Sequence, residues 1–164
     1  MKCELIKLEK LSGKAASIYS LKVNDEEKTR FDMFLEENES LFKSELKDIL
    51  LRITAIGQCT GAREQYFKRY EGVPGDLVCA LYDNPDKNLR LYCIRYGTSL
   101  VILGGGGLKN VQKLQEDSKL EQENLLMRDL SAKIKERMDS REIGFTSDYM
   151  EFEGNLTFND EDDE

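Results

Sequence analysis

Three runs of apolar residues between Leu77 and Lys109 have the spacing of β-strands. They read LVCALYD, LRLYCIRY and LVILGGGGLK, and short turns at residues 84–88 and 97–99 separate them. Runs of this length, rich in aliphatic and aromatic residues and bounded by turn residues, are typical of consecutive strands. The sequence therefore predicts a meander over residues 77–109, and we expect any ligand site of the protein to lie on it.

The pattern before the meander predicts a hairpin and two helices. Residues 2–10 and 16–23 read as strands joined by a Ser-Gly turn, which gives an N-terminal hairpin over 2–23. Asn24 and Ser40 then stand where helix N-caps are expected, each ahead of apolar residues at helical spacing. We therefore predict a helical hairpin over residues 25–56 that covers one face of the sheet.

The pattern after the meander predicts one more helix and then a change of composition. Ser118 and Glu121 form a capping box, and apolar positions at helical spacing continue to Met138. We predict a helix over 119–138, which completes a domain spanning 1–138. Residues 139–164 are acidic and are expected to form a flexible, solvated tail. A sharper alternative is that this tail occupies a basic surface of the body and mimics nucleic acid.

Charge is distributed unevenly along the chain. The net charge is −8, but residues 1–110 hold 17 Lys and Arg against 16 Asp and Glu, whereas residues 111–164 hold 7 against 16. The overall acidity is therefore a poor guide to what the body of the domain binds.

The chain contains no histidine, and its four cysteines show no CxxC spacing. The absence of histidine excludes a Ser-His-Asp triad and a histidine general base, and a zinc site is not expected. We predict no metal, no cofactor and a reducing, cytoplasmic location. We also expect no signal peptide and no membrane segment, because no run approaches the roughly 20 apolar residues that a spanning helix requires.

The middle strand of the meander carries candidate ligand contacts. Alternation places Arg90, Tyr92 and Tyr96 on one face, and Arg95 on the other with the more apolar residues. If the apolar set faces the helices, the first set lies on an open face. A guanidinium can hold a phosphate, and a tyrosine or a lysine can transfer a proton. The alternative is that an antiparallel sheet with one wet face simply displays such residues there.

Two further stretches allow two interpretations each. The basic-aromatic stretch REQYFKRY contains Arg63, Lys68 and Arg69 and could stack bases and hold phosphates, or its aromatic residues could fill the core. The glycine run Gly104–Gly107 could offer backbone N–H groups to a phosphate, although it fits neither a Walker motif nor GxGxxG. The favoured alternative is that a neighbouring backbone approaches closely there.

The segments REQYFKRYEG, LRLYCIRYG and LVILGGGGLKN, in this order over residues 15–138, resemble the RelE/ParE/HigB superfamily of bacterial toxins. The HigB-like and phage-derived branch is the most similar. The resemblance implies an α+β fold in which an antiparallel sheet carries two N-terminal helices on one face and a C-terminal helix. It also implies the toxin of a toxin–antitoxin pair, a ribosome-dependent mRNA endonuclease without a metal or a small-molecule cofactor.

On this resemblance Arg90 matches the residue that contacts the scissile phosphate, and Lys109 matches the basic position after the last strand. Tyr96 completes the predicted catalytic set. The predicted RNA contacts are Arg63, Lys68, Arg69, Tyr92 and Arg95. The expected partners are mRNA on the ribosome and a cognate antitoxin, a helix-turn-helix protein. The rival interpretation is a RelE-like binding protein with weak or no catalysis that acts through a protein partner such as an antitoxin, because the strand lysines and the histidine of many relatives are missing.

Overall fold

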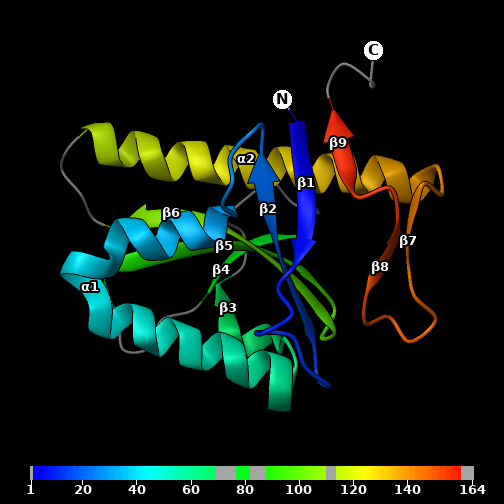
Figure 1. Cartoon of the computed structure of the whole chain (residues 1–164), viewed down its shortest axis with the longest axis horizontal. Helices are drawn as coiled ribbons and strands as arrows, with labels where there is room; N and C mark the ends of the chain where they lie inside the picture. Colours follow the sequence, from blue (N-terminus) through cyan, green and yellow to red (C-terminus); the bar gives the residue numbers. More distant parts are fainter. Residues whose placement is uncertain (1, 69–76, 82–87, 110–113, 160–164) are drawn as a thin grey trace.

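A computed structural model describes residues 2–68, 77–81, 88–109 and 114–159. Within these ranges a seven-stranded sheet lies between two long helices (Figure 1). The elements in chain order are β1 (Lys2–Lys7), β2 (Ser17–Val23), α1 (Arg30–Ala55), η1 (Ile56–Thr60), η2 (Glu64–Tyr66), β3 (Phe67–Lys68), β4 (Val78–Leu81), β5 (Leu89–Tyr96), β6 (Leu100–Leu108), α2 (Leu114–Asp139), β7 (Ile143–Phe145), β8 (Phe152–Gly154) and β9 (Thr157–Asn159).

The sheet is mixed, with the strand order β3-β4-β5-β6-β2-β1-β9. β2 and β6 run parallel, with Ile18 opposite Val101, while the other neighbouring pairs of this sheet are antiparallel. The prediction of an antiparallel RelE-like sheet with two N-terminal helices on one face is therefore wrong. The parallel contact joins strands about 80 residues apart in the chain, and such a pairing leaves no local sequence signal.

α1 occupies the region of the predicted helical hairpin over 25–56, and its two arms meet at a kink at Phe42, where φ is −131° and ψ is 35°, two residues after the predicted N-cap Ser40 (Figure 1). Its N-cap is Thr29, whose side chain accepts a hydrogen bond from a first-turn amide. The helix continues through the polar stretch after Leu35, where Glu and Ser cost only a few tenths of a kcal/mol, and is interrupted at Phe42. One turn before the kink, the buried Asn38 amide donates to the Phe34 carbonyl at 2.8 Å, which satisfies this polar group inside the first arm.

The two helices cover opposite faces of the sheet, so the core has two layers (Figure 1). The layer under α1 contains Ile18, Phe31, Ile53, Leu91, Cys93 and Val101. The layer under α2 contains Tyr19, Tyr92, Ile94, Ile102, Met127 and Ile134. Alternation along β5 thus predicts correctly which residues share a face. However, the face we expected to be open is covered by α2.

The glycine run Gly104–Gly107 is buried in β6, beneath α2. The pairing of β5 and β6 shifts by one residue between Leu91 and Cys93, which marks a β-bulge in β6. A Cβ atom on Gly104 would lie 2.5 Å from the Met127 sulfur, and one on Gly106 only 1.8 Å from a β5 carbonyl oxygen. Close packing therefore accounts for Gly104 and Gly106, and the burial of the run leaves no room for a phosphate.

A buried ion-pair network links the start of α1 to α2 beside this bulge. Glu123 of α2 is 5% exposed, and its Oε1 accepts from Arg30 Nη1 at 3.2 Å. Its Oε2 has no hydrogen-bond partner among the described residues and faces Gly105. Burial raises the pKa of the Glu123 carboxyl, while the charges of Arg30 and Lys119 oppose the rise. Glycine at 105 thus leaves space for a carboxylate that holds two helices together.

A second buried carboxylate, Glu45 of α1, fixes the start of β5. Glu45 is 7% exposed, and its Oε1 accepts from the backbone N–H groups of Asn88 and Leu89 at 2.9 and 2.8 Å. Its other oxygen accepts from the Asn88 side chain at 3.4 Å. Unlike Glu123, this carboxylate uses both oxygens, so it anchors the first residues of the strand to the second arm of the bent helix.

The acidic C-terminal segment was expected to be a flexible tail, and the structure corrects this expectation as far as residue 159. β7 and β8 pair with each other, and β9 adds to the outer edge of β1. Phe158 is fully buried beneath the Arg137 guanidinium, which lies 4.1 Å from the ring centroid and donates to the Asn155 and Thr157 carbonyls. The segment folds because its aromatic residues have a place in the core despite acidic neighbours.

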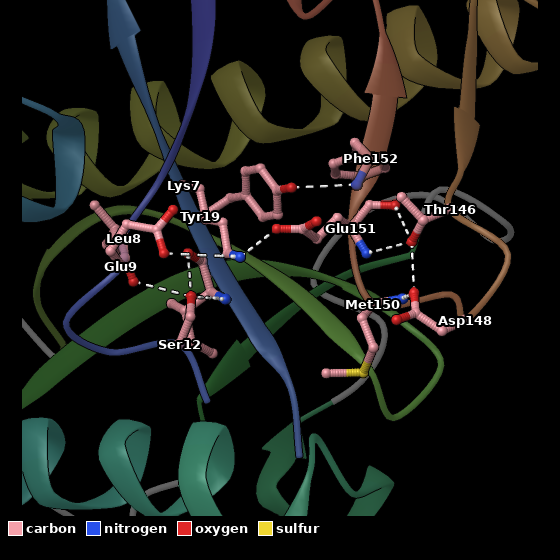
Figure 2. A network of polar contacts seen from close by, with 11 residues as sticks. Lys7, Leu8, Glu9, Ser12, Tyr19, Thr146, Asp148, Met150, Glu151 and Phe152 are labelled. Atoms are coloured by element: carbon pink, nitrogen blue, oxygen red, sulfur yellow. Dashed lines mark hydrogen bonds and ion pairs between the residues drawn. The ribbon is translucent and has the colours of Figure 1, made fainter. Parts of the chain in front are cut away.

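Polar contacts connect this segment to the N-terminal hairpin (Figure 2). Lys7 pairs with Glu151, and the Tyr19 hydroxyl accepts from the Phe152 amide at 3.1 Å. β9 and β3 lie at opposite edges of the sheet. β9 is therefore remote from Lys68 on β3, whereas Phe145 and Phe152 of β7 and β8 pack against Tyr96 of β5. None of these contacts involves the basic-aromatic stretch.

Candidate functional site

The structure brings together two of the three predicted catalytic residues. Arg90 and Lys109 lie at the same end of β5 and β6, where the Lys109 amide donates to the Asn88 carbonyl at 2.7 Å. Tyr96 ends β5, and at the rise of a strand it lies roughly 20 Å from Arg90. The three side chains therefore do not share one reaction centre.

Tyr96 lies in an aromatic cluster rather than at a ligand site. Its ring makes edge contacts with Phe145 and Phe152, at centroid distances of 5.9 and 5.4 Å. Burial raises the pKa of the Tyr96 phenol well above its usual range. The phenol consequently stays protonated at neutral pH, and it is not placed to accept a proton from RNA.

Two of the predicted RNA contacts on β5 are structural. Tyr92 is 4% exposed and lies in the core layer under α2, so it does not reach a ligand at the surface. Arg95 donates from Nε to the Ala62 carbonyl at 2.6 Å. The structure thus gives Arg95 a different partner from the phosphate that we expected, a backbone carbonyl in the loop after α1.

The basic-aromatic stretch lies at the β3 edge of the sheet. Arg63 and Lys68 are exposed and stand on either side of η2, while Phe67 is buried in the layer under α1. Tyr66 is partly buried and packs against the same layer. Arg69 lies outside the described residues. Both interpretations of the stretch therefore hold in part, since the aromatic residues reach the core and the basic residues stay in solvent.

Tyr66 also lines a pocket of about 390 Å³ between the end of α1, η1, η2 and β4. Its walls are Arg52, Ala55, Ile56, Thr60, Gln65, Tyr66 and Leu81. A volume of this size, with mostly apolar walls and a few polar groups, is typical of small-ligand sites. The pocket combines an aromatic ring, a guanidinium and an amide, which are the groups that stack on a flat base and bond to its edge.

The backbone conformation between α1 and η2 shapes one side of this pocket. α1 ends in the single π-helical turn η1, and π-helical turns occur frequently at functional sites. Gly61 then adopts a φ of +76°, which a residue with a side chain rarely does. The Thr60 hydroxyl donates to the Gly61 carbonyl at 2.9 Å and stabilises the turn. The chain leaves α1 through this turn and enters η2 with Tyr66 beside the helix end.

The sequence predicts Arg63 and Lys68 as RNA contacts beside this pocket, but not Arg52, Thr60 or Gln65. Arg52 belongs to the last turn of a helix interpreted as a cover for the sheet. Thr60 and Gln65 stand in a stretch treated as a connecting loop. The one available signal was Gly61, because a glycine directly after a helix marks a sharp change of chain direction.

The described residues contain no group of three or more His, Cys, Asp or Glu side chains that could hold a metal ion. The four cysteines are free, and Cys59 is the exposed one. In the same part of the chain, neither helix combines the length and the apolar character needed to cross a membrane.

Comparisons with protein-family models, with curated protein sequences and with solved structures find no match to this chain. The case for a function therefore depends on the residues of the Tyr66 pocket and on the sequence resemblance described above.

Proposed function

We propose that this protein binds single-stranded RNA at the β3 edge of its sheet, with one base in the Tyr66 pocket. The observation that carries the proposal is the combination of a partly buried tyrosine lining a pocket of about 390 Å³ with exposed cations before and after it in the chain. Arg63 precedes η2 and Lys68 follows Tyr66 by two residues, so a strand of RNA that rounds this edge can contact both.

The energetics favour a single strand over a duplex. Stacking of a base on an aromatic side chain contributes about 1–3 kcal/mol and is available only to an unpaired base. Phosphate contacts from Arg63 and Lys68 add affinity that falls with salt concentration. Neither contribution requires a metal or a histidine, and the sequence contains no histidine.

The cellular role that we propose is the one implied by the sequence resemblance. The RNA would be mRNA on the ribosome, and the protein would act in the cytoplasm as a toxin controlled by an antitoxin. The support for this role is the REQYFKRYEG segment, which contains Tyr66 and Lys68. The structure adds no support from the fold, because the predicted RelE-like arrangement is wrong.

Binding can be tested with one RNA sequence in two forms. We expect fluorescence anisotropy to show that the protein binds a labelled pyrimidine- and purine-containing single strand at least tenfold more tightly than the same sequence in a duplex. The affinity should fall as salt concentration rises. Equal affinity for the two forms, or no binding at low salt, would contradict the proposal.

RNA cleavage is a second candidate function, favoured by the adjacency of Arg90 and Lys109. Two cations at one end of β5 and β6 can stabilise the charge on a phosphate during cleavage. Induction of the protein in a bacterial host should then arrest growth and produce mRNA cuts near the ribosomal A site. Arg90→Ala should abolish both effects. Growth arrest without mRNA cuts would instead support RNA binding without cleavage.

A further inference from the structure

Arg95 connects the Tyr66 pocket to the meander. Its Nε donates to the Ala62 carbonyl at 2.6 Å, and the Ala62 amide donates to the Thr98 carbonyl in the β5–β6 turn at 2.7 Å. Ala62 is fully buried. Both polar groups of this one residue are therefore held by the end of the hairpin that β5 and β6 form.

The two hydrogen bonds of Ala62 fix the positions of the residues before and after it in the chain. Before it, Gly61 lies so close to the turn that a Cβ atom would be 3.0 Å from the Thr98 carbonyl oxygen. After it, the Tyr66 amide donates to the Arg63 carbonyl at 3.0 Å, which closes the turn η2. The position of Ala62 thus determines where η2 begins and hence where the Tyr66 ring stands beside α1.

An alternative role for Arg95 is direct contact with RNA phosphate, as the sequence suggested. Its guanidinium is partly buried, and the Nε donor is directed inward at Ala62. Arg63 and Lys68, by contrast, are exposed. Arg63 and Lys68 are therefore placed to contact RNA, whereas Arg95 holds the Ala62 carbonyl.

We propose that Arg95 is a positioning residue that, together with the Thr98 carbonyl, preorganises the Tyr66 pocket for its ligand. The inference rests on the proposed function in naming RNA as that ligand. Preorganisation raises affinity because the loop does not have to be ordered when the ligand binds.

The first experiment compares affinity with its salt dependence. Arg95→Met should weaken binding of the labelled single strand about tenfold, the scale of one lost charged hydrogen bond, without changing the slope of log affinity against log salt. Arg95→Lys, whose ammonium can still donate to Ala62, should restore part of the loss. The matched control Arg141→Met, at an exposed arginine after α2, should leave affinity unchanged. A slope that falls by about one in Arg95→Met would show a direct phosphate contact and overturn the inference.

The second experiment does not need RNA. Hydrogen exchange at the amides of Ala62 and Tyr66 should become at least tenfold faster in Arg95→Met, while exchange at Cys93 in the middle of β5 stays the same. Unchanged exchange at Ala62 and Tyr66 would overturn the inference even if RNA binds. If wild-type protein fails to bind RNA but the exchange result holds, the proposed function fails, while the control of the pocket by Arg95 stands.

Discussion

The glycine run Gly104–Gly107 and the basic-aromatic stretch 63–68 are the two most unusual segments of the sequence, and they occupy opposite environments. The glycines are buried in the middle of the sheet, with α2 lying directly on them. The basic-aromatic stretch lies at the β3 edge, with its cations in solvent and Tyr66 lining a pocket. Both segments could have been phosphate sites by composition, and only one is accessible to a ligand.

The comparison shows that the elements packed on a segment, more than its composition, decide whether a ligand can reach it. A Cβ atom at Gly106 has no space beside a backbone carbonyl, whereas one at Gly107 would meet its nearest neighbour, a Leu120 methyl, at 3.6 Å, an ordinary van der Waals contact. Between two adjacent residues the strand therefore changes from a position that excludes a side chain to one that has space for it. The glycines reflect packing, and the accessible chemistry lies at the edge.

The largest expected effect separates these two glycines. Gly106→Ala should destabilise the protein by about 3 kcal/mol or more, because its Cβ atom would meet a β5 carbonyl that cannot move without disturbing the sheet. Gly107→Ala is the matched control in the same strand and should change stability by less than about 0.5 kcal/mol. Denaturant unfolding of the two variants measures the difference. Equal stability would show that the close contact at Gly106 is not real.

The next-largest expected effect concerns Tyr66 at the β3 edge of the sheet. Tyr66→Ala should weaken binding of single-stranded RNA by about 2 kcal/mol, or roughly thirtyfold, because the stacking surface is lost. Tyr149→Ala is the matched control, since Tyr149 is exposed in the C-terminal segment. Anisotropy titrations of the two variants give the comparison. If both variants bind as wild type does, Tyr66 is only a core residue.

A smaller effect is expected from the exposed cations. Arg63→Gln and Lys68→Gln should each reduce affinity several-fold and lower the salt slope by about one, because each removes one phosphate contact. Lys14→Gln, at an exposed lysine of the N-terminal turn, should leave the slope unchanged. The measurement is a series of titrations at increasing salt. Slopes that match wild type in both variants would exclude phosphate contacts at this edge.

The smallest effect concerns Glu123 beside the glycines. Burial raises its pKa above the ordinary value of 4.5, so the folded protein binds this proton more tightly than the unfolded chain does. The contribution of this proton to stability is complete below about pH 4.5 and is lost as pH rises through the raised pKa. Glu123→Gln does not titrate, so its stability relative to wild type should increase between about pH 4 and pH 7. Unfolding curves at both ends of this range check the sign, and a constant difference would contradict the pKa shift.

Local patterns in the sequence were sufficient for some elements of the fold. Alternation and turn residues made β1, β2, β5 and β6 readable, because adjacent strands of a hairpin are specified by neighbouring residues. Alternation also assigned Tyr92 and Cys93 to opposite faces of β5. The helix α2 was recognisable from apolar positions at helical spacing up to Met138, but it begins at Leu114, so Ser118 lies inside the helix and the predicted capping box is wrong.

The remaining features depend on contacts between distant residues. The parallel pairing of Ile18 with Val101 and the docking of Phe158 under Arg137 have no local signal. The break predicted at residues 37–40 lies close to the kink of α1 at Phe42, so the local sequence carried part of this signal. Among the residues of the site, the composition of the sequence identified Arg63 and Lys68. Arg52 and Gln65 line the same pocket only because the chain changes direction at Gly61, between them.

The central claim is that RNA binds at the β3 edge and not on the glycine strand, and one measurement tests it most directly. The protein should be cross-linked by ultraviolet light to a single-stranded RNA that contains 4-thiouridine, and the modified peptide identified by mass spectrometry. We expect the cross-link to lie within residues 60–68, with Tyr66 the principal residue. A cross-link near Arg90 and Lys109, or within the C-terminal segment 143–159, would contradict it.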